Sequence, residues 1–403
     1  MDNQFLISLT KKYGAPLYVY NADVIKNQYN RMMNAFSSVK NVKLNYAVKS
    51  NTNINVLKFL KNLGSGGDCV SVQEIKLCLA AGFNVADISY TPNGVSFEEI
   101  EEAHNLGVKI TLDNLSSLDK FGKLFPNAPV SLRINPHIMA GGNAKISVGH
   151  VDSKFGISHT QIEEIKAIVK ANKTPVNGVH MHTGSDIKDP QAFVDAMNIL
   201  LGIATQFDSI EFIDLGSGFK VAYKEGDHAT NLEELGKVLG ARFNTFCKEY
   251  GKELKLIFEP GKFLVSESGK FLAKVNVIKQ TPNINFVGVD SGLNHLMRPM
   301  MYDAYHKVSN ISNPDGEKQT YNVVGYICET DTFASSRELG KVSEGDIICM
   351  DNAGAYCFSM ASNYNSRFRP AEVLVIKGED FLIRERETFE DILKNQILID
   401  SLS

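Results

Sequence analysis

Short apolar runs alternate with amphipathic stretches along the first two thirds of the chain. The runs are rich in valine, isoleucine and leucine and mostly continuous, as in strands buried on both faces of a parallel sheet. Eight of them lie between residues 20 and 265, at 42–48, 66–70, 87–91, 108–113, 130–135, 176–182, 210–216 and 254–259. A strand followed by a helix, repeated about eight times, predicts a (β/α)8 barrel.

Several of the intervening stretches carry helix N-terminal signals. Ser71, Ser96 and Ser158 each stand three residues before Glu or Gln, which is the capping-box pattern. Asn21 is predicted to cap another helix, whose apolar face would carry Ile25, Tyr29, Met32, Met33 and Phe36. An open, doubly wound sheet is the alternative architecture. It usually carries a GxGxxG turn after its first strand, and this sequence has none there.

The pattern changes after residue 265. Short β-like runs follow one another at turn-rich intervals, which predicts an antiparallel β-sandwich or barrel. We expect the strand APLYVYN (15–21) to join it and FEDILKNQILI (389–399) to form a helix. The sequence therefore predicts a barrel domain at 25–265, and a β domain with a C-terminal helix at 1–24 and 266–403.

Charge and cysteine spacing narrow the possible partners. The 403-residue chain has a net charge of -4, which argues against a nucleic-acid partner. It has no apolar run near the roughly 20 residues that span a bilayer, and its first residues do not resemble a signal peptide. Six singly spaced cysteines without ligand spacing indicate free thiols rather than disulfides or a metal site. We expect a soluble, cytoplasmic protein without a metal.

Candidate chemistry gathers where the predicted strands end. In barrels of this type, catalytic groups lie at the C-terminal ends of the strands. Taken singly, each candidate has an ordinary explanation, such as a solvated lysine or a glycine in a turn. Together they would line one rim: Lys49, Asp113, Arg133, Asn135, His182, Ser185, Gly216, Ser217, Gly218, Glu259, Gly261 and Lys262.

The combination of residue types indicates an aldehyde and a phosphate. A lysine forms a Schiff base with a carbonyl group. Glycine-rich loops after the seventh and eighth strands commonly bind phosphate through backbone N–H groups. A carboxylate would keep a pyridine nitrogen protonated, and a histidine would lie flat against the ring. These features together predict a pyridoxal phosphate site.

Several motifs resemble those of one enzyme family. These motifs are YAVKSN, GDCVSVQE, SLRINP, SKFGI, HMHTGS, LGSGF, EPGK, GYICETDTFA and NAGAYCFSMASNYN. They resemble the motifs of the fold-type III pyridoxal phosphate decarboxylases, whose barrel is alanine racemase-like. Within that group they are most similar to the motifs of the diaminopimelate decarboxylases. The motifs run in the family's order from about residue 40 to 372. The resemblance implies decarboxylation of meso-diaminopimelate to L-lysine, pyridoxal phosphate as cofactor, and a homodimer with shared active sites.

The resemblance implies a role for each residue that matches a cofactor motif. Lys49 would bind the cofactor covalently, His182 would stack on its ring, and Glu259 would pair with its ring nitrogen. The residues implied around the phosphate are Ser185, Gly216, Ser217, Gly218 and Gly261. Relatives commonly have glycine where Ser217 stands, but a serine amide donates equally well if its φ is compatible.

Further roles are implied for the second domain. Arg298 and Tyr302 match contacts to a substrate carboxylate. Cys328, as proton donor, and Glu329, as partner of the substrate's ammonium, match a pair that the second subunit inserts into the site. Tyr356 matches a tyrosine that reaches the cofactor or the substrate.

One motif departs from the family pattern. Diaminopimelate decarboxylases usually have EPGR, whose arginine grips the substrate carboxylate, whereas this chain has Lys262 there. Lysine keeps the charge but loses the bidentate fork. Separately, the polar, glycine-containing segment 137–156 is predicted to be a lid over the site.

Other functions remain open at this point. A decarboxylase of the same fold acting on carboxynorspermidine, ornithine or arginine would share most motifs, although Arg298 argues against a substrate that ends only in an amine. An amino-acid racemase would use the same barrel. A non-catalytic relative that binds pyridoxal phosphate or regulates by contact belongs to a different class. A cofactor-free Schiff-base aldolase would leave Glu259 and the glycine loop unexplained.

Overall fold

The chain forms two compact units. The computed structural model describes residues 1–138, 149–187, 190–399 and 401. One unit, the β unit, comprises residues 1–25, 223–226 and 265–403, and the other, the barrel unit, comprises 26–222 and 227–264. Residues 223–226 lie inside the range predicted for the barrel but group with the β unit.

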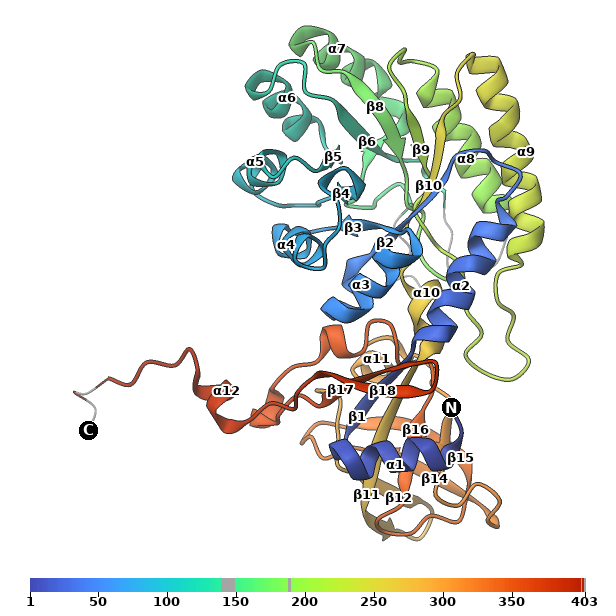
Figure 1. The fold of residues 1–403 in the computed structure, drawn as a ribbon, viewed down its shortest axis with the longest axis vertical. Coiled ribbons are helices and arrows are strands. Elements are labelled where there is room, and N and C mark those ends of the chain that lie inside the picture. The colour runs from blue at the N-terminus through green and yellow to red at the C-terminus, as the bar shows by residue number, and fades with distance from the viewer. Residues whose placement is uncertain (139–148, 188–189, 400, 402–403) are drawn as a thin grey trace. The chain divides into compact units, whose positions relative to one another are not determined.

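The barrel unit contains a closed ring of eight parallel strands (Figure 1). Neighbouring strands follow the order β5-β4-β3-β2-β10-β9-β8-β6, and the pairing of β5 with β6 closes the ring. Each lies within a range predicted from the apolar runs, so the barrel prediction is confirmed. The strands are β2 (Val42–Ala47), β3 (Gly66–Cys69), β4 (Ile88–Tyr90), β5 (Lys109–Leu112), β6 (Val130–Asn135), β8 (Val176–His180), β9 (Phe212–Asp214) and β10 (Lys255–Phe258). The short β7 (Ile157–Ser158) pairs with β6 outside the ring.

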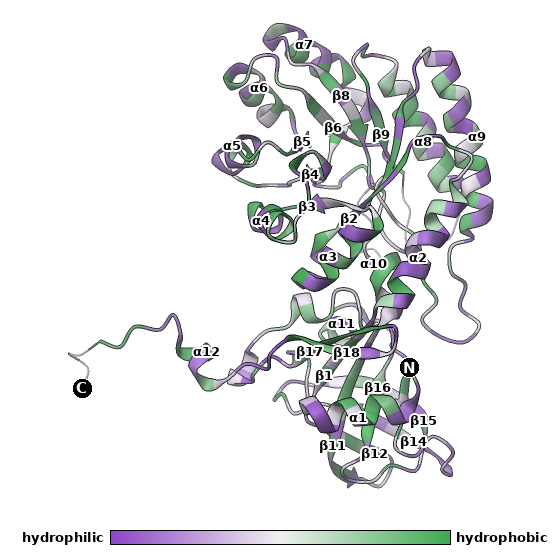
Figure 2. Cartoon of the chain, viewed as in Figure 1, coloured by the Kyte–Doolittle hydropathy of each residue, from purple (hydrophilic) through white to green (hydrophobic). Residues whose placement is uncertain are grey.

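Helices connect the strands, and each helix buries its own apolar face. Figure 2 shows apolar residues along the strands and mixed polar and apolar residues on the helices. The helices are α2 (Ala22–Ala35), α3 (Ile54–Leu63), α4 (Val72–Ala80), α5 (Phe97–Asn105), α6 (Leu115–Leu124), α7 (Ile162–Asn172), α8 (Pro190–Ala204), α9 (Leu232–Tyr250) and α10 (Lys262–Val265). In the described part of the chain, no helix has the length and apolarity needed to cross a bilayer.

Most predicted caps are found where the sequence placed them. The side chains of Ser71 and Ser96 accept hydrogen bonds from backbone N–H groups three residues later, at 3.2 and 3.3 Å. Asn21 accepts from the Asp23 N–H at 2.9 Å and precedes α2. Ser158 differs, because it caps a 3-10 turn, His159–Gln161, and α7 begins only at Ile162.

The β unit is built on a nine-stranded sheet with the N-terminal strand in its middle. Strand β1 pairs antiparallel with β11 and parallel with β17, which confirms that the N-terminal strand joins this domain. The β12–β14 pairing is also parallel, so the sheet is mixed rather than wholly antiparallel. The strands are β1 (Leu17–Asn21), β11 (Gly269–Gln280), β12 (Asn285–Val289), β13 (Val308–Asn310), β14 (Lys318–Val324), β15 (Thr332–Gly340), β16 (Ile347–Met350), β17 (Ala371–Ile376) and β18 (Glu379–Arg384).

Two helices of this unit differ from the prediction. Helix α1 (Asn3–Tyr13), which the sequence analysis did not identify, packs Leu6 and Leu9 into the apolar core of the sheet. The helix predicted at 389–399 is only α12 (Phe389–Leu393). Beyond it, Ile397 and Leu398 are 90% and 93% exposed, so no packing offsets the cost of ordering another turn. Helix α11 (Arg298–Tyr302) carries two of the predicted site residues.

Candidate active site

Lys49 lies at the carboxyl end of the barrel beside a buried acid. It belongs to a 3-10 turn, Val48–Ser50, directly after β2, and its side chain is 42% exposed. Its Nζ is 3.4 Å from Oδ2 of Asp68, the buried third residue of β3. Burial and the negative charge of Glu259 raise the pKa of Asp68 to about 6, and Lys49 opposes this rise. The amine is therefore held in place by an acid that the sequence analysis did not single out.

Glu259 follows β10 and is buried as an ion. Its Oε2 lies 2.9 Å from His180 Nε2, and its backbone N–H donates to the Gly216 carbonyl at 2.6 Å. Burial acts to raise the pKa of Glu259, but the charge and hydrogen bond of His180 and the charge of Lys49 outweigh it and lower the pKa to about 2. A carboxylate accepts and cannot donate, so the His180 Nε2–H is the donor.

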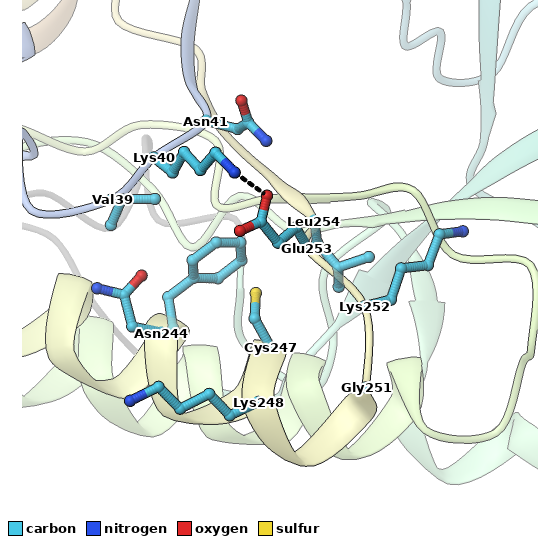
Figure 3. A pocket seen from close by; sticks show the side chains of 11 residues that line it. Val39, Lys40, Asn41, Asn244, Cys247, Lys248, Gly251, Lys252, Glu253 and Leu254 are labelled. Carbon is cyan, nitrogen blue, oxygen red and sulfur yellow. Dashed lines mark hydrogen bonds and ion pairs between the residues drawn. The ribbon is translucent and has the colours of Figure 1, made fainter.

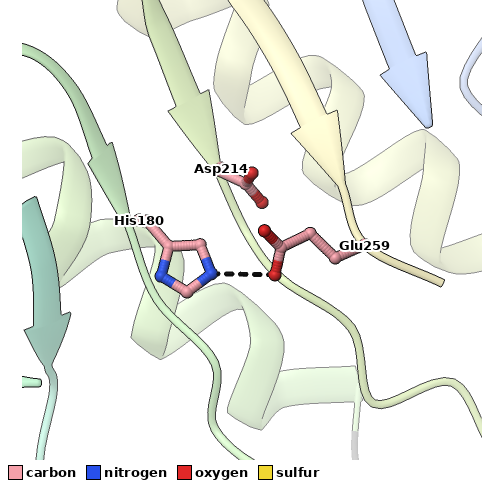
Figure 4. A group of neighbouring side chains, drawn as sticks. All are labelled: His180, Asp214 and Glu259. Carbon is pink, nitrogen blue, oxygen red and sulfur yellow. Dashed lines mark hydrogen bonds and ion pairs between the residues drawn. The ribbon is translucent and has the colours of Figure 1, made fainter. Parts of the chain in front are cut away.

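Asp214 completes a buried cluster with these two residues, as Figure 4 shows. One side-chain donor atom each from His180, Asp214 and Glu259 lie within 4.8 Å of one another. Burial and the charge of Glu259 raise the pKa of Asp214 well above its usual value. The sequence contained a signal for His180, because alternate strand residues point to the same face and His180 stands two positions before His182.

His182 is neutral, and its proton can be assigned to one nitrogen. Its Nδ1 accepts a hydrogen bond from the Ser217 N–H at 3.2 Å, which leaves the proton on Nε2. Removal from water lowers the pKa of His182 to about 3, and the charges of Arg133 and Lys49 act in the same direction. The imidazole therefore adds no positive charge to the site at pH 7.

Glycines leave bare backbone at the ends of β9 and β10. Gly216 has a φ of 64°, and a Cβ there would collide with the Met181 carbonyl oxygen. Gly218 has a φ of 138°, and a Cβ at Gly261 would lie 2.7 Å from Ser50 Oγ. Ser217 does not have a positive φ, so serine fits between the two glycines. Backbone without obstructing side chains can approach an anion closely. The N–H groups of Gly216 and Ser217 already donate to Asp214 Oδ1 and His182 Nδ1, at 2.8 and 3.2 Å.

Lys262 forms an ion pair that the sequence did not predict. It is the first residue of α10, is buried, and places Nζ 2.6 Å from Asp186 Oδ1. Asp186 follows the half-buried Ser185 in the loop after β8. The side chain expected to grip a substrate carboxylate therefore has a protein carboxylate beside it.

Arg298 and Tyr302 lie together within the β unit. The Arg298 guanidinium is 5.9 Å from the Tyr302 ring and 5.8 Å from the ring of Tyr223. Its Nη2 also donates to the Tyr223 hydroxyl at 3.4 Å. The sequence analysis did not identify Tyr223, which belongs to the 223–226 segment of this unit.

Cys328 and Glu329 form a second, exposed group in the β unit. Asn365 Nδ2 donates to Cys328 Sγ at 3.2 Å, and the Tyr364 hydroxyl donates to Glu329 Oε1 at 3.0 Å. Tyr356 is half-buried and has a φ of 56°. Of the predicted lid, 137–156, residues 139–148 lie outside those that the structure describes.

The barrel residues fit pyridoxal phosphate. Among the described residues, none hydrogen-bonds Glu259 Oε1, although this atom is buried and belongs to an ionised carboxylate. Such an acceptor calls for a donor of the kind that a protonated pyridine nitrogen provides. The same unit contains glycine backbone that a phosphate could approach. It also contains the exposed amine of Lys49, which could react with an aldehyde.

A cavity of about 410 Å³ lies at the other end of the barrel strands (Figure 3). It is lined by residues that precede β2 and β10 and by the last turns of α9, including Lys40, Cys247 and Glu253. Lys40 Nζ and Glu253 Oε2 are 2.6 Å apart across it. Because the strands are parallel, this cavity faces away from Lys49 and Glu259 and is separate from the candidate site.

Known proteins resemble the chain over almost its whole length. Residues 22–266 match the family "Pyridoxal-dependent decarboxylase, pyridoxal binding domain". Diaminopimelate decarboxylase of Methanothermobacter thermautotrophicus is 38% identical over 97% of this chain and 93% of its own. The structure of diaminopimelate decarboxylase from Helicobacter pylori complexed with L-lysine has a TM-score of 0.88 at 32% identity, covering 96% of this chain and 98% of that one. The enzyme from M. jannaschii in complex with L-lysine has a TM-score of 0.89 at 32% identity, covering 99% and 95%.

Proposed function

Because this chain belongs to the pyridoxal-dependent decarboxylases, and within them to the diaminopimelate decarboxylase family, we propose that it converts meso-diaminopimelate to L-lysine and CO2. The observation that carries the proposal is the buried, ionised Glu259, whose Oε1 has no hydrogen-bond partner among the described residues. It belongs to the same barrel end as the exposed amine of Lys49. The two solved relatives that hold L-lysine support lysine as the product.

We assign the cofactor contacts to residues of the barrel unit. Lys49 would hold the aldehyde of pyridoxal phosphate, His182 would lie against the ring, and Glu259 would take the ring nitrogen. The phosphate would be held by Ser185 and by the loops that contain Gly216, Ser217, Gly218 and Gly261, in which the Gly216 and Ser217 N–H groups already have protein acceptors. When bound, pyridoxal phosphate supplies an electron-withdrawing ring that accepts the electron pair released as CO2 departs.

The charges of the barrel residues suit this chemistry. An ionised Glu259 raises the pKa of a nitrogen that it contacts, and so keeps a proton on that nitrogen. A neutral His182 adds no competing positive charge beside it. Asp68 holds the Lys49 ammonium at 3.4 Å, which keeps the amine at the carboxyl end of the barrel.

We assign substrate contacts and proton transfer to the β unit. Arg298 and Tyr302, which lie together, would bind the distal carboxylate of the substrate. Cys328 would donate the proton that replaces the carboxylate at Cα, and Glu329 would hold the distal ammonium. Tyr356 would contact the cofactor or the substrate.

Lys262 is a further candidate for the substrate carboxylate, but its ion pair with Asp186 favours a supporting role. An ammonium that already contacts a carboxylate at 2.6 Å has less to gain from a second one. In this proposal, recognition of the distal carboxylate depends mainly on Arg298. Lys262 would mainly hold the loop that contains Ser185 and Asp186.

We further propose a homodimer in the cytoplasm. Cys328 and Glu329 are exposed on the single chain, as residues that act in a partner's site would be. All six cysteines are free thiols, which suits a reducing compartment.

Product analysis tests the proposed reaction. Purified protein, incubated with pyridoxal phosphate and meso-diaminopimelate, is expected to release L-lysine and CO2 in equal amounts. Lys49→Ala should abolish both. Ornithine, arginine and carboxynorspermidine in parallel reactions test the other decarboxylases of this fold. Faster turnover of any of these, or racemisation without CO2, would reject the proposal.

A further inference from the structure

Two buried polar residues beside Glu259 have no place among the cofactor and substrate contacts assigned above. His180 is the last residue of β8, and Asp214 is the last residue of β9. Both are almost fully buried, and with Glu259 they form the cluster in Figure 4. Burying polar side chains is unfavourable unless they are paired, so the cluster calls for a physical reason.

The contacts hold Glu259 by its side chain, to His180, and by its backbone, to Gly216 of the glycine loop. His180 donates to Glu259 Oε2 at 2.9 Å. The backbone of Gly216 is held at two points. Its N–H donates to Asp214 Oδ1 at 2.8 Å, and its carbonyl accepts from the Glu259 N–H at 2.6 Å. Rotation of the Glu259 carboxylate would break the bond to His180, and displacement of Gly216 would break two more.

We propose that His180 and Asp214 are positioning residues, which hold Glu259 and Gly216 so that the Glu259 carboxylate stays in place for the ring nitrogen of the cofactor. The inference rests on the proposed function, because it assumes pyridoxal phosphate in this site. It adds two residues that would not touch substrate or cofactor but would act through Glu259.

The charges agree with this arrangement. Two adjacent buried carboxylates would repel each other, and the two pKa values move apart: burial and the charge of Glu259 raise that of Asp214, whereas His180 and Lys49 lower that of Glu259. Asp214 Oδ1 accepts from the Gly216 N–H at 2.8 Å, and the raised pKa of Asp214 favours a proton on its other oxygen. An asparagine has the same shape, one donor group and one acceptor oxygen, and therefore mimics the neutral acid.

This equivalence gives a sharp set of variants. Asp214→Asn retains the acceptor oxygen for the Gly216 N–H, whereas Asp214→Ala removes it. His180→Gln retains an N–H donor toward Glu259, whereas His180→Leu removes it. His295→Leu, at a buried histidine of the β unit, is the control for loss of a buried imidazole. Glu259→Gln is the reference for loss of the carboxylate itself.

The measurement is the binding of pyridoxal phosphate to cofactor-depleted protein, followed by absorbance across a pH series. Asp214→Ala and His180→Leu should weaken binding roughly 10- to 100-fold, because each leaves a buried hydrogen-bonding group without its partner. Their bound spectra should shift in the same direction as that of Glu259→Gln. Asp214→Asn, His180→Gln and His295→Leu should stay within about 3-fold of wild type, a difference below 1 kcal/mol.

A double variant separates positioning from general stability. Adding His180→Leu to Glu259→Gln should cause little further change in the spectrum, because the two changes remove the same interaction. A purely structural His180 would lower the melting temperature and leave the spectrum of the bound cofactor unchanged.

Three results would overturn the assignment. The first is wild-type binding and spectra in both Asp214→Ala and His180→Leu. The second is an Asp214→Asn variant as damaged as Asp214→Ala, which would require a charged carboxylate. The third is stoichiometric binding of Zn²⁺ alone that Asp214→Asn abolishes, since the three donors also suit a metal by type. If wild type itself fails to bind pyridoxal phosphate, the proposed function falls and this inference falls with it.

Discussion

At the scale of single residues, similar burial produces opposite pKa shifts in the barrel acids. The pKa of Glu259 falls to about 2 because His180 and Lys49 outweigh the effect of burial. The pKa of Asp68 rises to about 6 because burial and Glu259 outweigh Lys49. Burial also raises the pKa of Glu74 to about 7, and the hydrogen bond that its carboxylate accepts from the Val70 N–H at 2.8 Å offsets this only in part. The neighbours therefore decide which acid is charged.

Glu74 leads to a prediction about stability and pH. A raised pKa in the folded state means that the folded protein holds this proton more tightly than the unfolded chain does. The free energy of unfolding should therefore fall as the pH rises from about 4.5 to about 7. Glu74→Gln, which does not titrate and can still accept from Val70, should reduce this fall by about 2 kcal/mol. Urea denaturation at about pH 5 and about pH 8 measures the difference.

The exposed Glu164 provides the matched control for that experiment. Glu164→Gln should leave the pH dependence as it is in wild type. An equal pH dependence in wild type and Glu74→Gln would show that Glu74 is not the titrating group.

At the scale of elements, the two terminal helices of the β unit differ in how much of their apolar surface is packed against the rest of the unit. Helix α1 places Leu6 and Leu9 in the core beside Leu17 and Val19 of β1. In α12 every residue is exposed or half-exposed, and Leu393 is 45% exposed. Both sequences are amphipathic, but only α1 has a partner surface within its unit that buries its apolar face.

A pair of truncations tests this difference. Leu9→Ala should lower the free energy of unfolding of the β unit by about 2 to 5 kcal/mol, because it leaves a cavity in a packed core. Leu393→Ala removes the same atoms from an exposed site and should change stability by less than about 1 kcal/mol. Chemical denaturation followed by a probe in the β unit measures both. Equal effects of the two substitutions would contradict the structure.

At the scale of the whole molecule, the roles proposed above are assigned to residues of both units. The cofactor residues belong to the barrel unit, whereas Arg298, Cys328 and Glu329 belong to the β unit. If Cys328 acts in the site of a second subunit, neither chain of the dimer is complete alone.

Mixing two inactive variants tests the shared site. Lys49→Ala lacks the cofactor amine, and Cys328→Ala lacks the proposed proton donor. After subunit exchange, half of the dimers are mixed and each mixed dimer contains one intact site, so activity should recover to about a quarter of wild type. Decarboxylation is assayed after exchange has been verified by mass. Absence of recovery in verified mixed dimers would place Cys328 in the site of its own chain, or outside the site.

The sequence by itself determined the repeating architecture and the strand ends at which the candidate site residues lie. Continuous apolar runs predicted all eight strands because burial on both faces leaves that signature in local sequence. Lys49, His182 and Glu259 could be nominated from the strand ends because parallel strands bring those ends to one rim.

Only the tertiary structure decided which side chains meet across the barrel. His180 and Glu259 are 79 residues apart, and the two members of the Lys262–Asp186 pair also come from different strand ends, so no local pattern encodes either contact. Whether an amphipathic helix persists, as in α1, or stops after five residues, as in α12, depends on a partner surface elsewhere in the chain. The same holds for charge, since the pKa of a buried acid such as Asp214 is set by groups that the fold, and not the sequence order, brings beside it.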